Sequence, residues 1–161
     1  MSNSPHIPVG LNLVAILEPK ADAAGRTGSW VSLKGAKRAW LCFYTDQGNA
    51  ATIAVSINQA SAVAGTGSKV ITNAIPIWAN QDAATNSIWT KATDAVNFTT
   101  SAAVKKKLIV FELDPATLDT ANSFDCVTLI TGASNAANIT SGFALIEPRL
   151  MQATVVDAML D

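Results

Sequence analysis

The sequence predicts an all-β protein: a single antiparallel β-sandwich, jelly-roll-like, with extended terminal arms. Three observations predict it, namely about eight to ten short apolar or alternating segments, turn residues at roughly ten-residue intervals, and almost no helical periodicity. Long connections rich in Gly, Ser and Ala disfavour a simple up-and-down meander and leave a jelly-roll-like sandwich as the favoured topology. The 161 residues suit one domain. We expect an N-terminal arm at residues 1–10, the β-sandwich at 11–149 and a C-terminal tail at 150–161.

Four strands are predicted in the first part of the chain. The arm ahead of them contains Pro5 and Pro8, which exclude a helix. The first strand alternates in hydropathy, then becomes fully apolar, and is expected to end at a Glu-Pro pair. The second strand is a short alternating stretch that follows a loop containing glycines. The third and fourth alternate over most of their length, and the turn residues between them predict a β-hairpin. These strands are expected at 11–17, 30–33, 37–45 and 52–58.

The third and fourth strands also show which side chains share a face. In the third strand, one face carries Ala39, Leu41 and Phe43, and the other carries Trp40, Cys42 and Tyr44. The fourth strand places Ile53, Val55 and Ile57 together. Trp40 lies in the middle of its strand, so we expect it in the core.

The remaining strands follow a linker of small residues at 60–68. They are expected at 70–71, 75–78, 88–90, 96–98, 107–113, 124–131 and 143–146. Pro76 confines its strand to a sheet edge, because proline cannot donate a ladder hydrogen bond. Asp114 followed by Pro115 combines a helix cap with proline at the first helical position, which predicts one helical turn. The segment 150–161 has helical spacing but is short and lacks a cap.

The charge balance excludes several classes of partner. Hydrophobic residues make up 49% of the chain but charged residues only 14%, with eleven basic and twelve acidic side chains. Phosphate binding needs an excess of Lys and Arg, so we expect no nucleic-acid partner.

The longest apolar run covers only residues 39–44, so we expect no membrane span. The first six residues lack the features of a secretory signal, and we expect synthesis in the cytoplasm.

The polar residues favour a subunit of a larger assembly. The chain contains 28 Ala, 16 Thr, 12 Ser and 11 Asn, so its polar surface consists mainly of hydroxyl and amide groups. Such a surface costs less to desolvate than a charged one. A small protein with almost no net charge lacks the self-repulsion that keeps a free monomer soluble.

The residue types needed for catalysis are sparse, and we predict no enzymatic activity, no metal and no cofactor. The single histidine, His6, lies in the arm, where it cannot serve as the base of a catalytic triad. Cys42 and Cys126 each lie in an apolar run and are expected to be buried and free, although a disulfide between them stays open. A carboxylate pair could still converge in space, but the three glutamates are scattered at strand ends: Glu18, Glu112 and Glu147.

Two groups of apolar residues are candidate interaction sites. Trp78 and Trp89 border the loop 80–87, where they could stack on a sugar or a protein neighbour, or pack beneath the loop. The tail carries five residues too apolar to face water alone: Met151, Val155, Val156, Met159 and Leu160. This tail either crosses to an adjacent subunit or folds back on its own sheet. Three consecutive lysines at 105–107 are interpreted as protection against edge aggregation rather than as a ligand site.

Three short stretches carry a family resemblance. Residues 111–119 (FELDPATLD), 124–127 (FDCV) and 132–135 (GASN) resemble small virion proteins encoded among the head genes of tailed phages. The strands within 40–57 fit the same resemblance, which covers residues 13–149.

This resemblance implies a capsid decoration or cement protein with no catalytic residues. Its partners would be the major capsid protein and further copies of itself, as a dimer or trimer at capsid symmetry axes. Its location would be the outer capsid surface of the virion. The alternative is a carbohydrate-binding β-sandwich module of a phage fibre or decoration, with Trp78 and Trp89 as its stacking platform.

Overall fold

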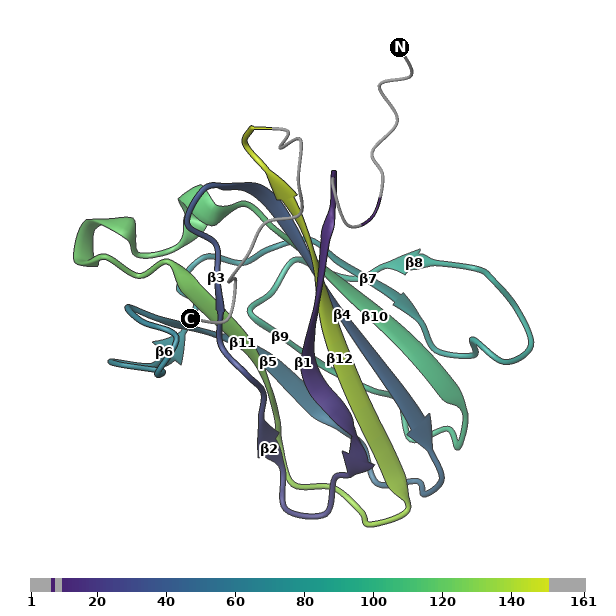
Figure 1. Ribbon diagram of the computed structural model, residues 1–161. Helices are drawn as coiled ribbons and strands as arrows, with labels where there is room; N and C mark the ends of the chain where they lie inside the picture. Colours follow the sequence, from purple (N-terminus) through teal and green to yellow (C-terminus); the bar gives the residue numbers. More distant parts are fainter. Residues whose placement is uncertain (1–6, 8–9, 151–161) are drawn as a thin grey trace.

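The computed structural model describes residue 7 and residues 10–150, which fold into two stacked antiparallel β-sheets (Figure 1). Sheet A has the strand order β1 (Asn12–Ala21), β12 (Asn138–Pro148), β4 (Ala36–Gln47), β10 (Lys106–Leu113), β7 (Ile77–Asn80) and β8 (Thr90–Lys91). Sheet B has the order β2 (Arg26–Thr27), β11 (Cys126–Thr131), β5 (Ala54–Ala60) and β6 (Lys69–Val70), while β3 (Val31–Ser32) also pairs with β11 and β9 (Asn97–Thr99) with β5.

The strand pairing is nested, which confirms the predicted jelly-roll-like sandwich. Along the sequence, the outermost pair is β1 with β12. Inside it lie the pairs of β2 and β3 with β11, then β4 with β10, and innermost β5 with β6 and β9. Successive pairs belong alternately to sheet A and sheet B. This alternation is the rolled arrangement of a double-sheet jelly roll. Strands β7 and β8 extend sheet A beyond β10.

The core lies between the sheets and is built from alternate residues of the long strands. The predicted faces of β4 and β5 are confirmed: Ala39, Leu41 and Phe43 are buried together, and so are Ile53, Val55 and Ile57. The other main contributors from the long strands are Ile109, Phe111, Leu113, Val127, Leu129, Ala144 and Ile146.

The predicted hairpin between β4 and β5 is wrong. The two strands lie in different sheets, and residues 48–53 cross between them. Both edges of β4 are occupied by long strands, β12 and β10, so no edge is left for β5. The crossover is held by the side-chain amides of Gln47 and Asn138, which both donate to the Ala51 carbonyl.

Two prolines do not have the predicted effect. Pro19 does not end the first strand, because β1 is an edge strand and its pairing with β12 is irregular between Leu17 and Lys20, where no ladder donor is required. Pro76 does not place β7 at the edge, because β7 lies between β10 and β8. Pro76 directly precedes β7, and only its carbonyl is used, as the acceptor for the Glu112 amide.

The predicted helical turn after β10 is confirmed. It is the single 3₁₀ turn η1 (Pro115–Thr117), in which the Asp114 carboxylate accepts a hydrogen bond from the Ala116 amide at 2.9 Å. A second 3₁₀ turn, η2 (Thr120–Asn122), follows it. The predictions for the two ends concern residues that lie almost wholly outside the described part: 1–10 and the tail with Met151, Val155, Val156, Met159 and Leu160.

Candidate interaction surface

The side of sheet A that faces away from the core is apolar. Ten small or large apolar and aromatic side chains of five adjacent strands form what we call the sheet A outer face: Leu13, Ala15, Trp40, Cys42, Tyr44, Trp78, Leu108, Val110, Phe143 and Leu145. An antiparallel sheet with one solvated face normally alternates apolar and polar residues. The central strands of sheet A are apolar on both faces.

The strand register makes this face continuous. Phe143 lies opposite Cys42, Cys42 opposite Val110, and Val110 opposite Trp78, so one apolar row crosses β12, β4, β10 and β7. Strands are about 4.8 Å apart, so this row is about 14 Å wide. A second row runs from Leu13 through Leu145 to Trp40.

The face is open at its β1 edge and partly open at its centre. Leu13 is 54% exposed. All the larger side chains of the two central rows except Cys42 are partly exposed. Neighbouring rings on a pleated face shield one another, so partial exposure is expected of an uncovered sheet. Contiguous apolar patches of this kind mark contact sites for other macromolecules.

Trp40 is therefore not a core residue, which corrects the prediction. The alternation of β4 sends Ala39 and Leu41 inward and Trp40 outward. The guanidinium of Arg38 lies 5.9 Å from the centroid of the Trp40 ring. This cation–π contact covers one side of the indole and leaves the rest on the surface.

Charged side chains border the apolar rows. Arg38 and Asp46 are the outward residues at the two ends of β4, and Lys106 and Glu112 stand towards the ends of β10. Lys106 pairs with Asp46 across the strands at 3.5 Å. The surface thus has an apolar centre and a charged rim, the usual arrangement of a protein–protein interface.

Cys42 lies in the middle of the face and acts as a small apolar residue. It is 6% exposed, and burial raises the pKa of its thiol to about 11. The prediction of two buried, free cysteines is confirmed: Cys126 lies on β11 in the other sheet, where burial and the neighbouring Asp125 raise its thiol pKa to about 12. Neither thiol is ionised near neutral pH, so neither is an activated nucleophile.

The two tryptophans predicted as an interaction site have different surroundings. Trp78 belongs to the sheet A outer face and lies opposite Val110 and Lys91. Trp89 is 42% exposed and precedes β8 at the end of the loop. A cleft of about 490 Å³ lies beside this loop, but Ile88, Thr90 and Ala92 line it and the tryptophans do not.

The polar groups of this cleft are already bound within the loop. The Asn80 amide donates to the Asn86 carbonyl, and the Asn86 side-chain oxygen accepts from the Ile88 amide. Asp82 forms an ion pair with Lys105, which holds the pKa of the Asp82 carboxyl below its usual range. The cleft is thus stabilised by its own contacts.

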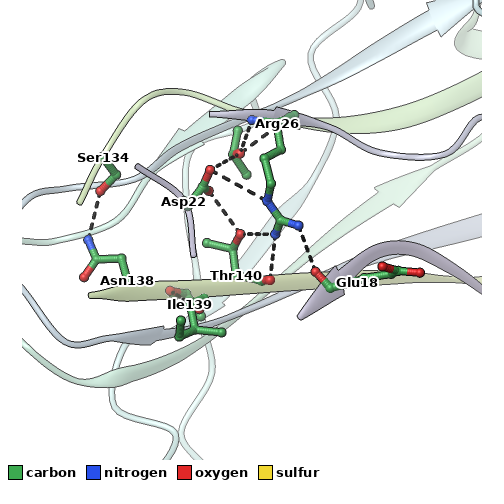
Figure 2. Close-up of polar contacts among 9 residues, drawn as sticks. Glu18, Asp22, Arg26, Ser134, Asn138, Ile139 and Thr140 are labelled. Atoms are coloured by element: carbon green, nitrogen blue, oxygen red, sulfur yellow. Dashed lines mark hydrogen bonds and ion pairs between the residues drawn. The ribbon is translucent and has the colours of Figure 1, made fainter. Parts of the chain in front are cut away.

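A second cluster of polar side chains joins the two sheets at one end of the sandwich (Figure 2). The Asp22 carboxylate is fully buried and accepts hydrogen bonds from the hydroxyls of Thr131 at 2.8 Å and Thr140 at 3.0 Å. The Arg26 guanidinium lies 3.9 Å from that carboxylate and donates to the backbone carbonyls of Glu18 and Thr140. Because these residues belong to or adjoin strands of both sheets, the cluster joins sheet A to sheet B.

The three consecutive lysines do not form a positive spot, and they do not protect a sheet edge. Strand β10 is an interior strand of sheet A. Lys105 and Lys106 pair with Asp82 and Asp46. Lys107 points inward and is fully buried, and its ammonium donates to the Gln47 side-chain oxygen at 2.7 Å and the Ser101 carbonyl at 2.6 Å. Burial lowers the pKa of Lys107.

Residues 7 and 10–150 contain no group of three or more His, Cys, Asp and Glu side chains placed to hold a metal ion. Within the same residues, no helix has the length and apolar character needed to cross a membrane.

Comparisons with known proteins identify no family. No protein-family model matches the chain, and no curated protein matches it. Among solved structures, the fold is similar to that of the SPBc2 prophage-derived protein YomS, with a TM-score of 0.49 and 6% sequence identity over 85% of this chain and 93% of that chain. A likeness at this level carries no functional conclusion.

Most residues of the sheet A outer face were not singled out from the sequence. Of its members only Trp78 was proposed as an interaction residue, and Trp40 was assigned to the core. The informative signal was that residues 39–44 and 108–111 are apolar at odd and even positions alike. A two-layer sandwich covers only one face of each sheet, so strands apolar on both faces need a further covering surface.

Proposed function

We propose that the protein is a non-catalytic structural subunit of a tailed-phage virion: a decoration or cement protein that binds the outer capsid surface and stabilises the head. The observation that carries this proposal is the sheet A outer face. A free monomer gains nothing from exposing Trp40, Trp78 and Phe143 on one sheet, whereas a subunit of an assembly buries such residues against a partner.

The phage setting is supported by the resemblance of residues 111–119, 124–127 and 132–135 to small virion proteins. The partners proposed are the major capsid protein and further copies of the chain, as a dimer or trimer at capsid symmetry axes. The low charge agrees with this role, because hydroxyl and amide surfaces are desolvated at smaller cost than charged ones.

Stabilisation would follow from mass action. A subunit that binds the assembled lattice but not its unfolded proteins lowers the free energy of the assembled state. Each contact can be weak, because many symmetry-related copies act together and linked contacts raise the overall affinity.

The test compares purified particles that carry and lack the protein. We expect DNA release on heating to begin at a lower temperature in particles that lack it, and re-addition of the pure protein to restore the original temperature. Mass spectrometry should find a copy number in simple proportion to the major capsid protein. Equal heat resistance of the two kinds of particle would contradict the proposal.

Carbohydrate binding is a second candidate, favoured by the exposure of Trp89 beside the loop cleft. An aromatic ring at 42% exposure can stack on a sugar face. A glycan array followed by a tryptophan fluorescence titration tests this role, with Trp89→Ala as the variant and Trp78→Ala as its control. Binding that survives Trp89→Ala would exclude this ring as the platform.

A further inference from the structure

We infer that the sheet A outer face is a self-association surface, which pairs with the same face of a second copy around a two-fold axis. The axis lies in the interface, perpendicular to the strands, and passes near Cys42. This inference specifies a partner for the face, and it does not depend on the phage setting proposed above.

The apolar row at the level of Cys42 fits such an axis. A two-fold axis along this row places each of its strands against the same strand of the second copy, running in the opposite direction. Phe143, Cys42, Val110 and Trp78 then meet their own counterparts. Two sheets packed in this way are about 10 Å apart, a gap that these side chains fill from both sides. The row contains no charged or strongly polar residue that would remain unpaired.

The charged ends of β4 select this orientation. Arg38 and Asp46 lie four residues to either side of Cys42 on the outward face. The axis therefore brings Arg38 of each copy to Asp46 of the other, which also pairs with Lys106 of its own chain, and this arrangement occurs twice. An axis parallel to the strands would instead place Arg38 against Arg38 and Asp46 against Asp46, which like-charge repulsion opposes.

The same geometry allows a test of the dimer whose result cannot come from a direct contact between Arg38 and Asp46 of one chain. Arg38 and Asp46 are eight residues apart on one strand, about 27 Å at the rise of a β-strand. They are too far apart to interact directly within a chain. Any energetic coupling between these two positions must pass between copies.

The first experiment measures the oligomeric state of the full-length protein by sedimentation equilibrium over a range of concentrations. We expect a reversible dimer. Val110→Lys places a charge in the apolar row and should give a monomer, whereas Ile130→Lys, at a partly exposed position on β11 in sheet B, should leave the dimer intact. Circular dichroism melting checks that each variant is folded.

The second experiment uses charge reversal at the two ends of β4, with circular dichroism melting of each variant to check its fold. Arg38→Asp and Asp46→Arg should each weaken the dimer by about tenfold, because each reversal creates two like-charge pairs. An equimolar mixture of the two variants should recover the affinity, because both pairs in the mixed dimer are again opposite. The double variant should recover it as well.

Three outcomes would overturn the inference. A wild-type protein that stays monomeric at all concentrations, with or without residues 151–161, would mean that the face is kept for a different protein. A wild-type monomer that dimerises only after removal of residues 151–161 would mean that the C-terminal tail covers the face within its own chain. A dimer that resists Val110→Lys, or a mixture that does not recover, would place the contact elsewhere. None of these outcomes affects the particle-heating test, so the two proposals fail separately.

Discussion

The two outer faces of this sandwich differ although one fold and one core produce both. The outward positions of β4, β10 and β12 in sheet A carry tryptophan, tyrosine, phenylalanine, leucine and valine. The outward positions of β5 in sheet B carry Ala54, Ser56 and Asn58, and those of β11 carry Cys126, Thr128 and a single large apolar side chain, Ile130. The outward positions of these two sheet B strands are thus mostly small or polar, although Cys126 and Thr128 are themselves buried, whereas those of sheet A are mostly large and apolar.

This difference is the reason for proposing sheet A, and not sheet B, as the contact surface. The core requires only the inward residues of each strand. Ser or Thr at the outward positions of sheet A would therefore support folding almost as well. The partly exposed Ser56 and Asn58 of sheet B are compatible with contact with water. The apolar face of sheet A is favourable only when covered, and in the dimer we propose the two charged ends on β4 set the orientation of the second copy.

The largest expected effect separates the inner from the outer face of sheet A. Phe43 is fully buried and Phe143 is partly exposed on the outer face. Phe43→Ala should destabilise the protein by about 3–5 kcal/mol at every protein concentration, because it leaves a cavity in the core. Phe143→Ala should cost much less in the dilute monomer and should mainly weaken the dimer. Urea unfolding at low and high protein concentration measures the free energy of unfolding of both variants. Equal losses of stability in the two variants would contradict the proposed difference between the two faces.

Asp22 tests whether the two sheets are locked together at one end. Asp22→Ala should destabilise the protein by about 3 kcal/mol, because Arg26 and the hydroxyls of Thr131 and Thr140 lose their buried acceptor. Glu18→Ala is the matched control, since only the backbone carbonyl of Glu18 contacts Arg26. Chemical denaturation of the two variants measures the difference, and a loss of stability below about 0.5 kcal/mol for Asp22→Ala would show that the cluster is dispensable.

Burial of Lys107 should make the stability of the protein depend on pH. The pKa of Lys107 is lowered by burial, so between that value and 10.5 the unfolded chain binds more protons than the folded one. Stability contributed by this residue therefore increases as the pH rises through that window. Lys107→Met should remove this increase from the pH dependence of unfolding, and Lys106→Met should keep it. An unchanged pH profile in Lys107→Met would contradict this assignment.

The two cysteines give the smallest effect and probe one sheet each. Both thiols are buried with raised pKa values, so maleimide should react slowly with both at pH 8 and faster as the pH rises towards 11. Dilution that dissociates the dimer should accelerate the reaction of Cys42 several-fold and leave that of Cys126 unchanged. The single variants Cys42→Ser and Cys126→Ser assign the two rates by mass spectrometry. Parallel changes at the two sites would show global opening rather than uncovering of sheet A.

Local patterns in the sequence were sufficient for the fold class and for the division of most strands into two faces. Alternation separated Ala39, Leu41 and Phe43 from Trp40, Cys42 and Tyr44, because side chains on a strand point to opposite sides whatever it pairs with. The capped turn at Asp114 and Pro115 was equally local, since both residues act within a few positions of themselves. The burial of the two cysteines followed from the apolar runs around them.

Only the tertiary structure decided which face became the core and which strands became neighbours. Trp40 was assigned to the core because it lies in the middle of its strand, yet β4 buries the opposite face against sheet B. The same holds for the crossover at 48–53, the continuation of β1 through Pro19 and the full length of β12, which depend on pairings between segments up to 134 residues apart, as between Asn12 and Ile146. Alternation along a strand defines two faces but gives neither of them a partner, and partners are set by long-range contacts between strands and sheets.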